Sequence, residues 1–312
     1  MSRIHDALKK AEEERQGSVR SQLVTGTLEK PAPVAPNTEI ASSAATDNRV
    51  SRATLATGGA PEPLTVEALQ TRIRILKWRP DPKRIVAYHN SDANLGTEEF
   101  RSLRSRLYQC RDAGPLRRVL VTSALPQEGK TYVAANLAHS IVRQSERRAI
   151  LIDADLRWSR LHTLLGTNLS PGLTDYLRGE TDELSIIQRG TLENLFLIPG
   201  GESASNASEL IANGRLKTLL DRLTPLFDWI IIDSPPAIAM SDASLLAEFC
   251  DGVLLVVASG KTPFDMAQKT REQFKKARLL GVVLNLAEPQ TTGSHYYYGY
   301  YQGGEKGKKA KG

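Results

Sequence analysis

The sequence is poor in cysteine and in long apolar runs, and both shortages argue against whole classes of protein. Its two cysteines, Cys110 and Cys250, belong to no Cys-x-x-Cys pair and no Cys/His group, which disfavours a disulfide framework and a structural zinc site. No apolar run reaches the roughly 18 residues of a membrane-spanning helix. Residues 1–16 also lack the apolar core of an export signal. We therefore expect a cytoplasmic protein whose cysteines are free and buried as small apolar side chains.

The chain also lacks a concentrated run of positive charge in its central part, although its formal net charge is +6. Residues 302–312 carry four lysines and one glutamate, so half of the excess charge lies in the last eleven residues. A polyanion partner is expected where excess charge gathers in one patch of a folded surface. The sequence therefore predicts no binding of nucleic acid.

Composition divides the chain into four segments. Residues 1–16 place apolar side chains at helical spacing among charged ones, which predicts a short amphipathic helix, either solvated and frayed or a docking peptide. Residues 17–63 are rich in Ala, Pro, Gly, Ser and Thr and have no aromatic residue, so we expect a disordered linker. Residues 64–290 form the predicted globular domain. Residues 291–312 form a flexible tail rich in tyrosine, glycine and lysine.

Short apolar runs alternate with longer helical patterns through the globular segment. The runs are continuous rather than alternating, as expected for strands that are buried on both faces of a parallel sheet. The sequence therefore predicts an α/β fold with a doubly wound, mostly parallel sheet. The loop at residues 123–131, after the first strand, makes the expected fold one of the P-loop NTPase type. The predicted strands are residues 118–122, 149–153, 195–199, 229–233, 253–258 and 281–285.

A loop between the first of these strands and a predicted helix, residues 132–144, has the form of a phosphate-binding P-loop. Its backbone N–H groups and the helix N-terminus are expected to face phosphate, Lys130 to reach the β/γ oxygens, and the Thr131 hydroxyl to coordinate Mg²⁺. Ala124 stands where the motif usually has its first glycine. The predicted nucleotide contacts are Ala124, Gln127, Glu128, Gly129, Lys130, Thr131 and Tyr132.

Acidic side chains follow two other predicted strands. Asp153 and Asp155 end one strand at a spacing that projects both side chains to the same side, and Asp233 ends another in the manner of a Walker B carboxylate. Because open α/β sheets bind ligands at the carboxyl ends of their strands, we expect these groups to converge with the P-loop. Asn285 ends a further strand, where its side chain either reads the adenine edge or caps a turn.

With these residues in place, the sequence resembles the bacterial protein-tyrosine kinases of capsule and exopolysaccharide export, over roughly residues 92–302. Residues 1–8 are similar to the subgroup associated with exosortase-linked loci. The resemblance rests on the loop 123–131, on Ile152-Asp-Ala-Asp-Leu-Arg157, on Ile232-Asp-Ser-Pro-Pro236, on Gly172-Leu-Thr-Asp-Tyr-Leu177, on a Glu-x2-Arg-x2-Arg pattern at Glu98, Arg101 and Arg104, and on a C-terminal tyrosine cluster.

The resemblance implies an ATP- and Mg²⁺-dependent tyrosine autokinase that phosphorylates the tail of a neighbouring copy. Lys130, Asp153, Asp155 and Asp233 are then the catalytic group. We assign proton acceptance to Asp153 and metal binding to Thr131, Asp155 and Asp233, although Asp153 and Asp155 exchange roles equally well on sequence grounds. The expected phosphorylation sites are Tyr296, Tyr297, Tyr298, Tyr300 and Tyr301.

The resemblance also implies partners. Glu98, Arg101 and Arg104 lie on one helical face, where they are either solvated helix charges or, as the family implies, subunit contacts in a ring-forming homo-oligomer. The further partners it implies are a membrane polysaccharide co-polymerase on a separate chain, which recruits the protein to the inner face of the membrane, and a cognate tyrosine phosphatase.

Two other functions fit parts of the pattern. One is a P-loop positioning ATPase that hydrolyses ATP without modifying itself, but such proteins usually carry a second lysine early in the loop, where this sequence has Leu125. The other is a nucleotide-binding scaffold that has lost catalysis, which the complete set of acidic residues disfavours.

Overall fold

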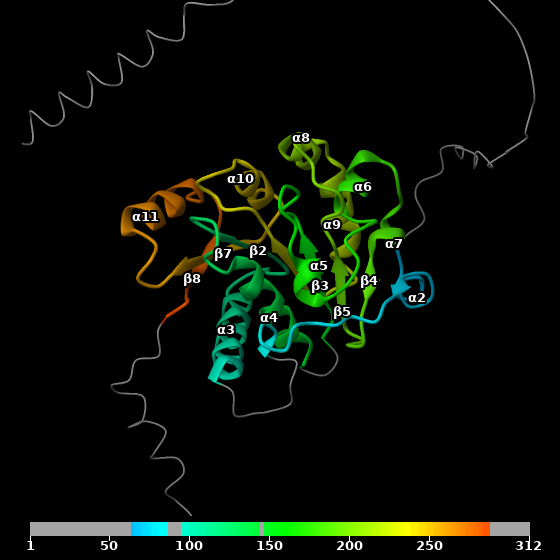
Figure 1. Ribbon diagram of the computed structural model, residues 1–312, viewed down its shortest axis with the longest axis horizontal. Coiled ribbons are helices and arrows are strands. Elements are labelled where there is room, and N and C mark those ends of the chain that lie inside the picture. Colours follow the sequence, from blue (N-terminus) through cyan, green and yellow to red (C-terminus); the bar gives the residue numbers. More distant parts are fainter. Residues whose placement is uncertain (1–63, 87–94, 144–146, 288–312) are drawn as a thin grey trace, which may run out of the picture. The chain divides into compact units, whose positions relative to one another are not determined.

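The computed structural model describes residues 64–86, 95–143 and 147–287, which are coloured in Figure 1. These residues fall within one compact unit and within the predicted globular segment. The predicted amphipathic helix, the predicted linker and the tyrosine-rich tail lie outside the described residues. The structure therefore leaves those three predictions as they stand.

Among the described residues, eight strands form one sheet with the order β1-β4-β5-β3-β6-β2-β7-β8. Every neighbouring pair is parallel except β4 and β5, so the predicted doubly wound, mostly parallel sheet is confirmed. The strands are β1 (Arg74–Ile75), β2 (Arg118–Ser123), β3 (Ala149–Asp153), β4 (Gln188–Arg189), β5 (Leu195–Ile198), β6 (Trp229–Asp233), β7 (Gly252–Ala258) and β8 (Leu279–Asn285).

Helices cover both faces of the sheet (Figure 1). Helices α3, α4 and α5 supply side chains to one apolar core, and α2, α6, α7, α8, α9 and α10 supply the other. The helices are α2 (Val66–Thr71), α3 (Leu95–Asp112), α4 (Lys130–Val142), α5 (Leu161–Leu165), α6 (Leu173–Arg178), α7 (Glu183–Ile186), α8 (Ala207–Ala212), α9 (Arg215–Leu223), α10 (Asp242–Ala247) and α11 (Phe264–Gln273).

The two cores explain why the strand sequences are apolar without interruption. Along β6, Ile230 and Ile232 face one core, Trp229 and Ile231 face the other, and all four side chains are buried. Burying one such side chain stabilises the fold by ~1.5–3 kcal/mol. A polar residue at any of these positions would lose that contribution and bury an unpaired group.

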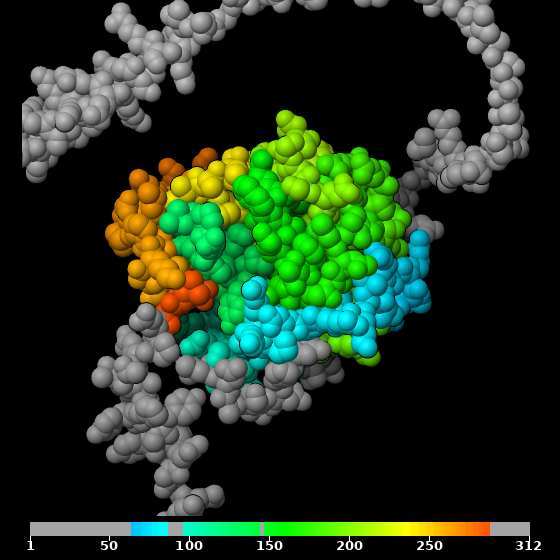
Figure 2. Space-filling view, viewed as in Figure 1, coloured from blue at the N-terminus to red at the C-terminus, as the bar shows by residue number. Residues whose placement is uncertain are grey.

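A segment before α3 lies against the end of α5. Figure 2 shows this segment as the cyan surface beside the green one. The backbone N–H of Arg79 donates to the carbonyl oxygen of Leu165 at 3.1 Å, and that of Asp81 donates to Leu164 at 3.4 Å. The indole ring of Trp78 packs closely against Gly190, and a Cβ atom added to Gly190 would lie 2.5 Å from that ring. These contacts attach the start of the domain to the side of the sheet that carries β4 and β5.

Two expectations from composition can be compared with the described residues. Cys110 and Cys250 are both free, as predicted, but each is half-buried rather than fully buried. Among the residues that the structure describes, no helix has the length and apolar character needed to cross a bilayer.

Candidate functional site

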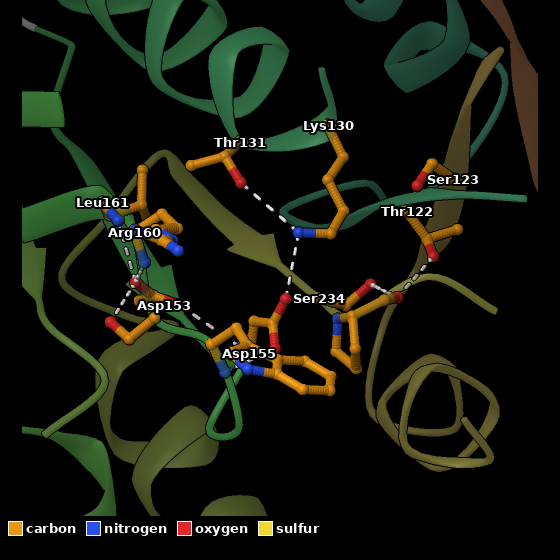
Figure 3. Close-up of polar contacts among 12 residues, drawn as sticks. Thr122, Ser123, Lys130, Thr131, Asp153, Asp155, Arg160, Leu161 and Ser234 are labelled. Atoms are coloured by element: carbon orange, nitrogen blue, oxygen red, sulfur yellow. Dashed lines mark hydrogen bonds and ion pairs between the residues drawn. The ribbon is translucent and has the colours of Figure 1, made fainter. Parts of the chain in front are cut away.

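The site is built at the carboxyl edge of the three central strands. Asp153 ends β3 and Asp233 ends β6, and these two residues are direct partners in the parallel register. On the other side of β6, Asp233 pairs with Val121 of β2, whose strand continues into the P-loop. The sheet therefore places two carboxylates beside the loop that carries Lys130, as expected from the order of the motifs. Figure 3 shows one of them, Asp153, together with Lys130.

The loop changes direction at two residues with positive φ before α4 begins. Gln127 has φ +64° and Gly129 has φ +89°. The second lies in the left-handed region, where glycine carries no Cβ penalty, and α4 begins directly after it at Lys130, two residues earlier than predicted. No side chain caps the N-terminus of α4, and its first turn contains no acidic residue. Its uncapped N–H groups and helix dipole therefore favour an anion at this point.

Lys130 stands among carboxylates at the start of α4. Its Nζ lies 3.0 Å from Oδ2 of Asp155 and 3.4 Å from the Thr131 hydroxyl, and its side chain is only 12% exposed (Figure 3). Burial lowers the pKa of Lys130, but the charges of Asp233, Asp155 and Asp153 outweigh that effect and hold the pKa above its ordinary value. Lys130 is therefore a fixed positive charge whose present counter-ions are the acidic groups of the site.

Asp153 is fully buried and its carboxylate is largely occupied by the loop that follows β3. Its Oδ2 accepts hydrogen bonds from the Ser159 hydroxyl at 2.5 Å and from the backbone N–H groups of Arg160 and Leu161, each at 3.0 Å (Figure 3). Its Oδ1 accepts a longer bond from the Asp155 N–H at 3.3 Å. Burial raises the pKa of Asp153 and these hydrogen bonds oppose the rise. Asp153 thus shapes the loop that carries Asp155.

Asp233 is equally buried but has no such partners. Within the described part of the chain, neither of its carboxylate oxygens has a hydrogen-bond partner, although the Thr131 side chain lies close by. Burial raises the pKa of Asp233 and the charge of Lys130 opposes the rise. A buried carboxylate without partners is costly in a folded protein. This group is therefore the strongest sign that the site is built for something the chain does not itself supply.

The donor set fits a magnesium ion bound together with a nucleotide. Asp155, Asp233 and the Thr131 hydroxyl offer hard oxygen ligands, and the orphaned carboxylate of Asp233 is the side chain that a cation would satisfy. In the described ranges, no three His, Cys, Asp or Glu side chains form a group that holds a metal without help. Mg²⁺ usually takes one or two carboxylates and completes its shell with phosphate oxygens and water.

Two residues predicted to contact the nucleotide have side-chain contacts within the protein. The carboxylate of Glu128 accepts from the N–H of Leu125 at 2.6 Å, from the N–H of Ala258 at 3.3 Å and from the hydroxyl of Thr262. Asn285 donates its side-chain N–H to the carbonyl oxygen of Glu128 at 2.8 Å. In this structure Asn285 therefore fixes the P-loop rather than a turn of its own, and Glu128 ties the loop to β7.

The remaining loop residues are placed as follows. Ala124 is fully buried, so its side chain packs inside the protein beneath the loop. The ring of Tyr132 packs against Phe100 of α3, with ring centroids 5.7 Å apart, and burial raises the pKa of its phenol. The phosphate contacts of Gln127, Gly129 and Thr131 stay predictions.

A second ion pair, missed by sequence reasoning, supports the loop after β3. Nε of Arg157 lies 2.9 Å from Oδ2 of Asp242 at the start of α10, and Ser208 donates its hydroxyl to the same carboxylate. Arg157 also donates to the carbonyl oxygen of Ser205 at 2.9 Å. Asp242 and Thr262 stand outside every recognisable motif, so the sequence offered no signal for either contact.

The Glu-x2-Arg-x2-Arg residues all lie on α3 but differ in what they contact. Glu98 and Arg101 form an ion pair within the helix. Arg104 donates to the carbonyl oxygen of Ser140 on α4 and approaches its hydroxyl at 3.4 Å. Burial lowers the pKa of Arg104. The motif therefore connects α3 to the helix that begins at the P-loop.

Comparison with known proteins places this geometry in context. A family model described as an AAA domain matches residues 127–274. The chain is 33% identical over 210 residues to the tyrosine-protein kinase YwqD of Bacillus subtilis, which covers 67% of this chain and 87% of that protein. It is 31% identical over 226 residues to the tyrosine-protein kinase ptk of Acinetobacter johnsonii, covering 72% of this chain. That match spans 30% of the Acinetobacter protein's own length.

A solved structure agrees with these relatives. The kinase domain of the Escherichia coli tyrosine kinase ETK superimposes with a TM-score of 0.62 at 27% sequence identity, covering 73% of this chain and 90% of that domain. The fold and the loop are those of a P-loop protein that binds a nucleotide.

Proposed function

This chain belongs to the bacterial tyrosine-protein kinases, and from that membership we propose that it is an autokinase that transfers the γ-phosphoryl group of ATP to its own tyrosine-rich tail. The observation that carries the proposal is the meeting of Lys130, Asp155 and the unpartnered carboxylate of Asp233 at the uncapped N-terminus of α4. An anion site, a positive charge and paired acids are what phosphoryl transfer with a divalent metal requires.

ATP and Mg²⁺ are the proposed cofactors. The backbone of the P-loop and the N-terminus of α4 bind the phosphates, while Asp155, Asp233 and the Thr131 hydroxyl hold the metal. Bound there, Mg²⁺ supplies positive charge to the phosphate oxygens. Without a nucleotide, Lys130 pairs with Asp155 at 3.0 Å. When ATP and the metal bind, the carboxylate of Asp155 holds the metal and Lys130 turns toward the β and γ oxygens of the phosphates.

The acceptor step places a demand on the base. A carboxylate near pKa 3.9 is about six units too weak to deprotonate a phenol near 10 before reaction, a gap of roughly 8 kcal/mol. A loose transition state needs little charge on the nucleophile, so the proton leaves late. The phenolic oxygen bonds to the γ-phosphorus while the bond to the β–γ bridging oxygen breaks, ADP leaves, and the proton passes to a carboxylate.

We assign that carboxylate to Asp153, with Asp155 as the alternative. Burial raises the pKa of Asp153, which makes its carboxylate a stronger base than an exposed one. Its Oδ1 has a single long hydrogen bond and is the oxygen left to receive a proton. Asp155 is instead assigned to the metal; without a ligand its two oxygens accept from Lys130 and from the N–H of Trp158.

The proposed acceptors are Tyr296, Tyr297, Tyr298, Tyr300 and Tyr301 of a neighbouring copy. Each phosphate adds roughly −1.5 to −2 charges, so three or more reverse the positive charge of the tail's last residues. An unmodified tail then binds the acidic site of its neighbour and a phosphorylated tail is repelled. Phosphorylation would in this way release the assembly.

We propose that Glu98, Arg101 and Arg104 help to hold the copies in a ring. The contact of Arg104 with Ser140 supports a link between such an interface and α4, and hence the P-loop. Replacing Glu98 by lysine should lower both the particle mass and tail phosphorylation in trans, because it removes the counter-ion of Arg101 and adds like charge. Light scattering measures the mass; a Glu98→Lys variant of unchanged mass removes this role. Glu183→Gln is the matched control, because Glu183 forms an ion pair with Arg222 on the face of the sheet opposite to α3.

The proposed setting is polysaccharide polymerisation and export. The partners are a membrane co-polymerase on a separate chain, which recruits this cytoplasmic protein to the inner face of the membrane and activates it, and a tyrosine phosphatase that resets the tail. These partners rest on family membership alone.

Mass spectrometry after incubation with ATP and Mg²⁺ tests the proposed reaction. We expect phosphate on residues 296–301 of the wild-type chain and none on a Lys130→Met chain, because loss of the lysine removes the charge that meets the transferring phosphate. Release of free phosphate without modification indicates a positioning ATPase instead. If neither phosphorylated tail nor free phosphate is formed, the protein is a nucleotide-binding scaffold. Both of these alternative results contradict the autokinase.

A further inference from the structure

Trp158 is an exposed tryptophan that lies beside the acidic residues of the site. The sequence has three tryptophans, and the other two, Trp78 and Trp229, are buried in the core. Trp158 is 60% exposed, three residues after Asp155 in the loop that follows β3. Trp158 therefore presents an apolar ring to the solvent close to Asp155, where a second aromatic ring can stack on it.

The backbone around Trp158 is fixed to the carboxylates of the site. The N–H of Trp158 donates to Oδ1 of Asp155 at 3.2 Å. The next two residues, Ser159 and Arg160, both donate to Oδ2 of Asp153, at 2.5 and 3.0 Å. These hydrogen bonds fix the backbone at Trp158 and just after it relative to the two acids. Figure 3 shows Asp153, Asp155 and Arg160 in this arrangement.

The loop of Trp158 and the end of β8 lie on opposite sides of the strand that leads into the P-loop. In the sheet order, β3 and β8 lie on opposite sides of β2, which leads into the P-loop. The loop of Trp158 follows β3, and Asn285 ends β8 and contacts the P-loop from the other side. Trp158 thus stands beside the acids that receive the acceptor, away from the side where Asn285 lies.

We propose that Trp158 is a substrate-docking residue, whose indole stacks against a tyrosine ring of the tail segment 296–301 and so brings the neighbouring phenol to the acids. This inference rests on the proposed function. The occupant is chosen from the chain itself, because the residues beyond β8 contain five tyrosines within six positions. Adjacent tyrosines allow one ring to stack on the indole while another presents its hydroxyl.

The size of the effect follows from aromatic pairing. Edge-to-face and offset-stacked pairs contribute a modest amount beyond the area that they bury, so loss of one pair should weaken tail binding roughly two- to ten-fold. The contact forms with the acceptor and not with ATP. The change should therefore appear in the KM for the tail, with kcat and the KM for ATP close to unchanged.

The kinetic test uses the full chain with its five tail tyrosines replaced by leucine, so that an added peptide of residues 293–303 is the only acceptor. We expect Trp158→Ala to raise the peptide KM roughly two- to ten-fold, and Trp158→Phe to restore most of the loss because it keeps a ring. Phe264→Ala is the matched control, since Phe264 is 83% exposed and lies at the start of α11. It should leave the peptide KM unchanged.

A second readout does not depend on catalysis. Because Trp158 is the exposed tryptophan, acrylamide quenching of tryptophan fluorescence reports mainly on it. The peptide should protect the fluorescence from acrylamide, and a peptide with leucine in place of tyrosine should not. Protection by ATP–Mg²⁺ alone identifies a platform for the adenine base and overturns the inference.

The outcomes separate this inference from the proposed function. An unchanged peptide KM in Trp158→Ala overturns the docking role even where the kinase is active. Fluorescence protection by the peptide without any phosphate transfer supports the docking role and refutes the autokinase. An absence of protection in the wild-type background overturns the docking role by itself.

Discussion

Replacing Asp233 by asparagine should make the nucleotide-free protein more stable while strongly slowing transfer. The wild-type chain buries a carboxylate with no hydrogen-bond partner among the described residues, and asparagine removes the charge at nearly the same size. We expect a gain of about 1–3 kcal/mol in the free energy of unfolding. We also expect a loss of about 100-fold or more in kcat, because the metal loses one of its two carboxylates.

The pH dependence identifies the cause of this gain. Burial raises the pKa of Asp233, so the folded state favours the protonated acid. At low pH the protonated side chain does not destabilise the fold. As the pH rises through the folded pKa, the side chain ionises in a buried position and the wild-type protein loses stability. The advantage of Asp233→Asn should therefore be larger at pH 8 than at pH 5. Urea unfolding at both values measures it, and an equal advantage at both contradicts burial of the charge as its source.

Asp228 provides a matched control at the other end of β6, because it directly precedes the strand that Asp233 ends. Its carboxylate accepts from Arg147 at 2.9 Å and from the N–H of Arg148 at 3.0 Å. Burial alone would raise the pKa of Asp228, but these partners lower it below its ordinary value. Asp228→Asn should therefore lower stability, opposite in sign to Asp233→Asn.

Adding ATP and Mg²⁺ should stabilise the wild type and not Asp233→Asn.

Replacing Asp153 by alanine should have the opposite effect on stability, although Asp153 is the register partner of Asp233. Three donors at Oδ2, from Ser159, Arg160 and Leu161, lose their acceptor in a buried site. Removing the buried charge recovers part of that cost, so we expect a net loss of about 2–4 kcal/mol in the free energy of unfolding. The midpoint of urea unfolding measures it.

Asp153→Asn separates the structural role from the chemical one. Its side-chain oxygen still accepts from the loop, so most of the stability should remain, but the group no longer takes a proton at neutral pH. We expect near-normal unfolding with strongly reduced transfer, by about 100-fold. An Asp153→Ala chain as stable as the wild type removes the structural role. An Asp153→Asn chain with full activity moves the base to Asp155.

The sheet was predictable because a strand that is buried on both faces requires apolar residues at every position, which gives a continuous apolar run in the sequence. All six predicted strands are present, with ends that differ by at most two residues. The strands that were missed, β1 and β4, are two residues long and include the polar side chains of Arg74 and Arg189. A strand of two residues has too little sequence to show any period.

The site was predictable to the extent that each group ends a strand. Register places Asp153 beside Asp233, so the acids meet wherever the parallel order is right. The direction of individual side chains was not predictable. Glu128 lies within the P-loop motif yet turns inward to Thr262, a residue 134 positions away in the chain. Contacts of this kind depend on tertiary packing and leave no local pattern.

Transfer between two chains that are each incomplete tests the central claim most directly. One chain keeps Lys130 and all three acids but has its five tail tyrosines replaced by phenylalanine; the other is Lys130→Met with its tail intact. Mixed with ATP and Mg²⁺, the Lys130→Met chain should gain phosphate on residues 296–301, as measured by mass spectrometry. A Lys130→Met chain that stays unmodified, while its intact-site partner hydrolyses ATP, contradicts phosphoryl transfer to the tail of a neighbouring copy.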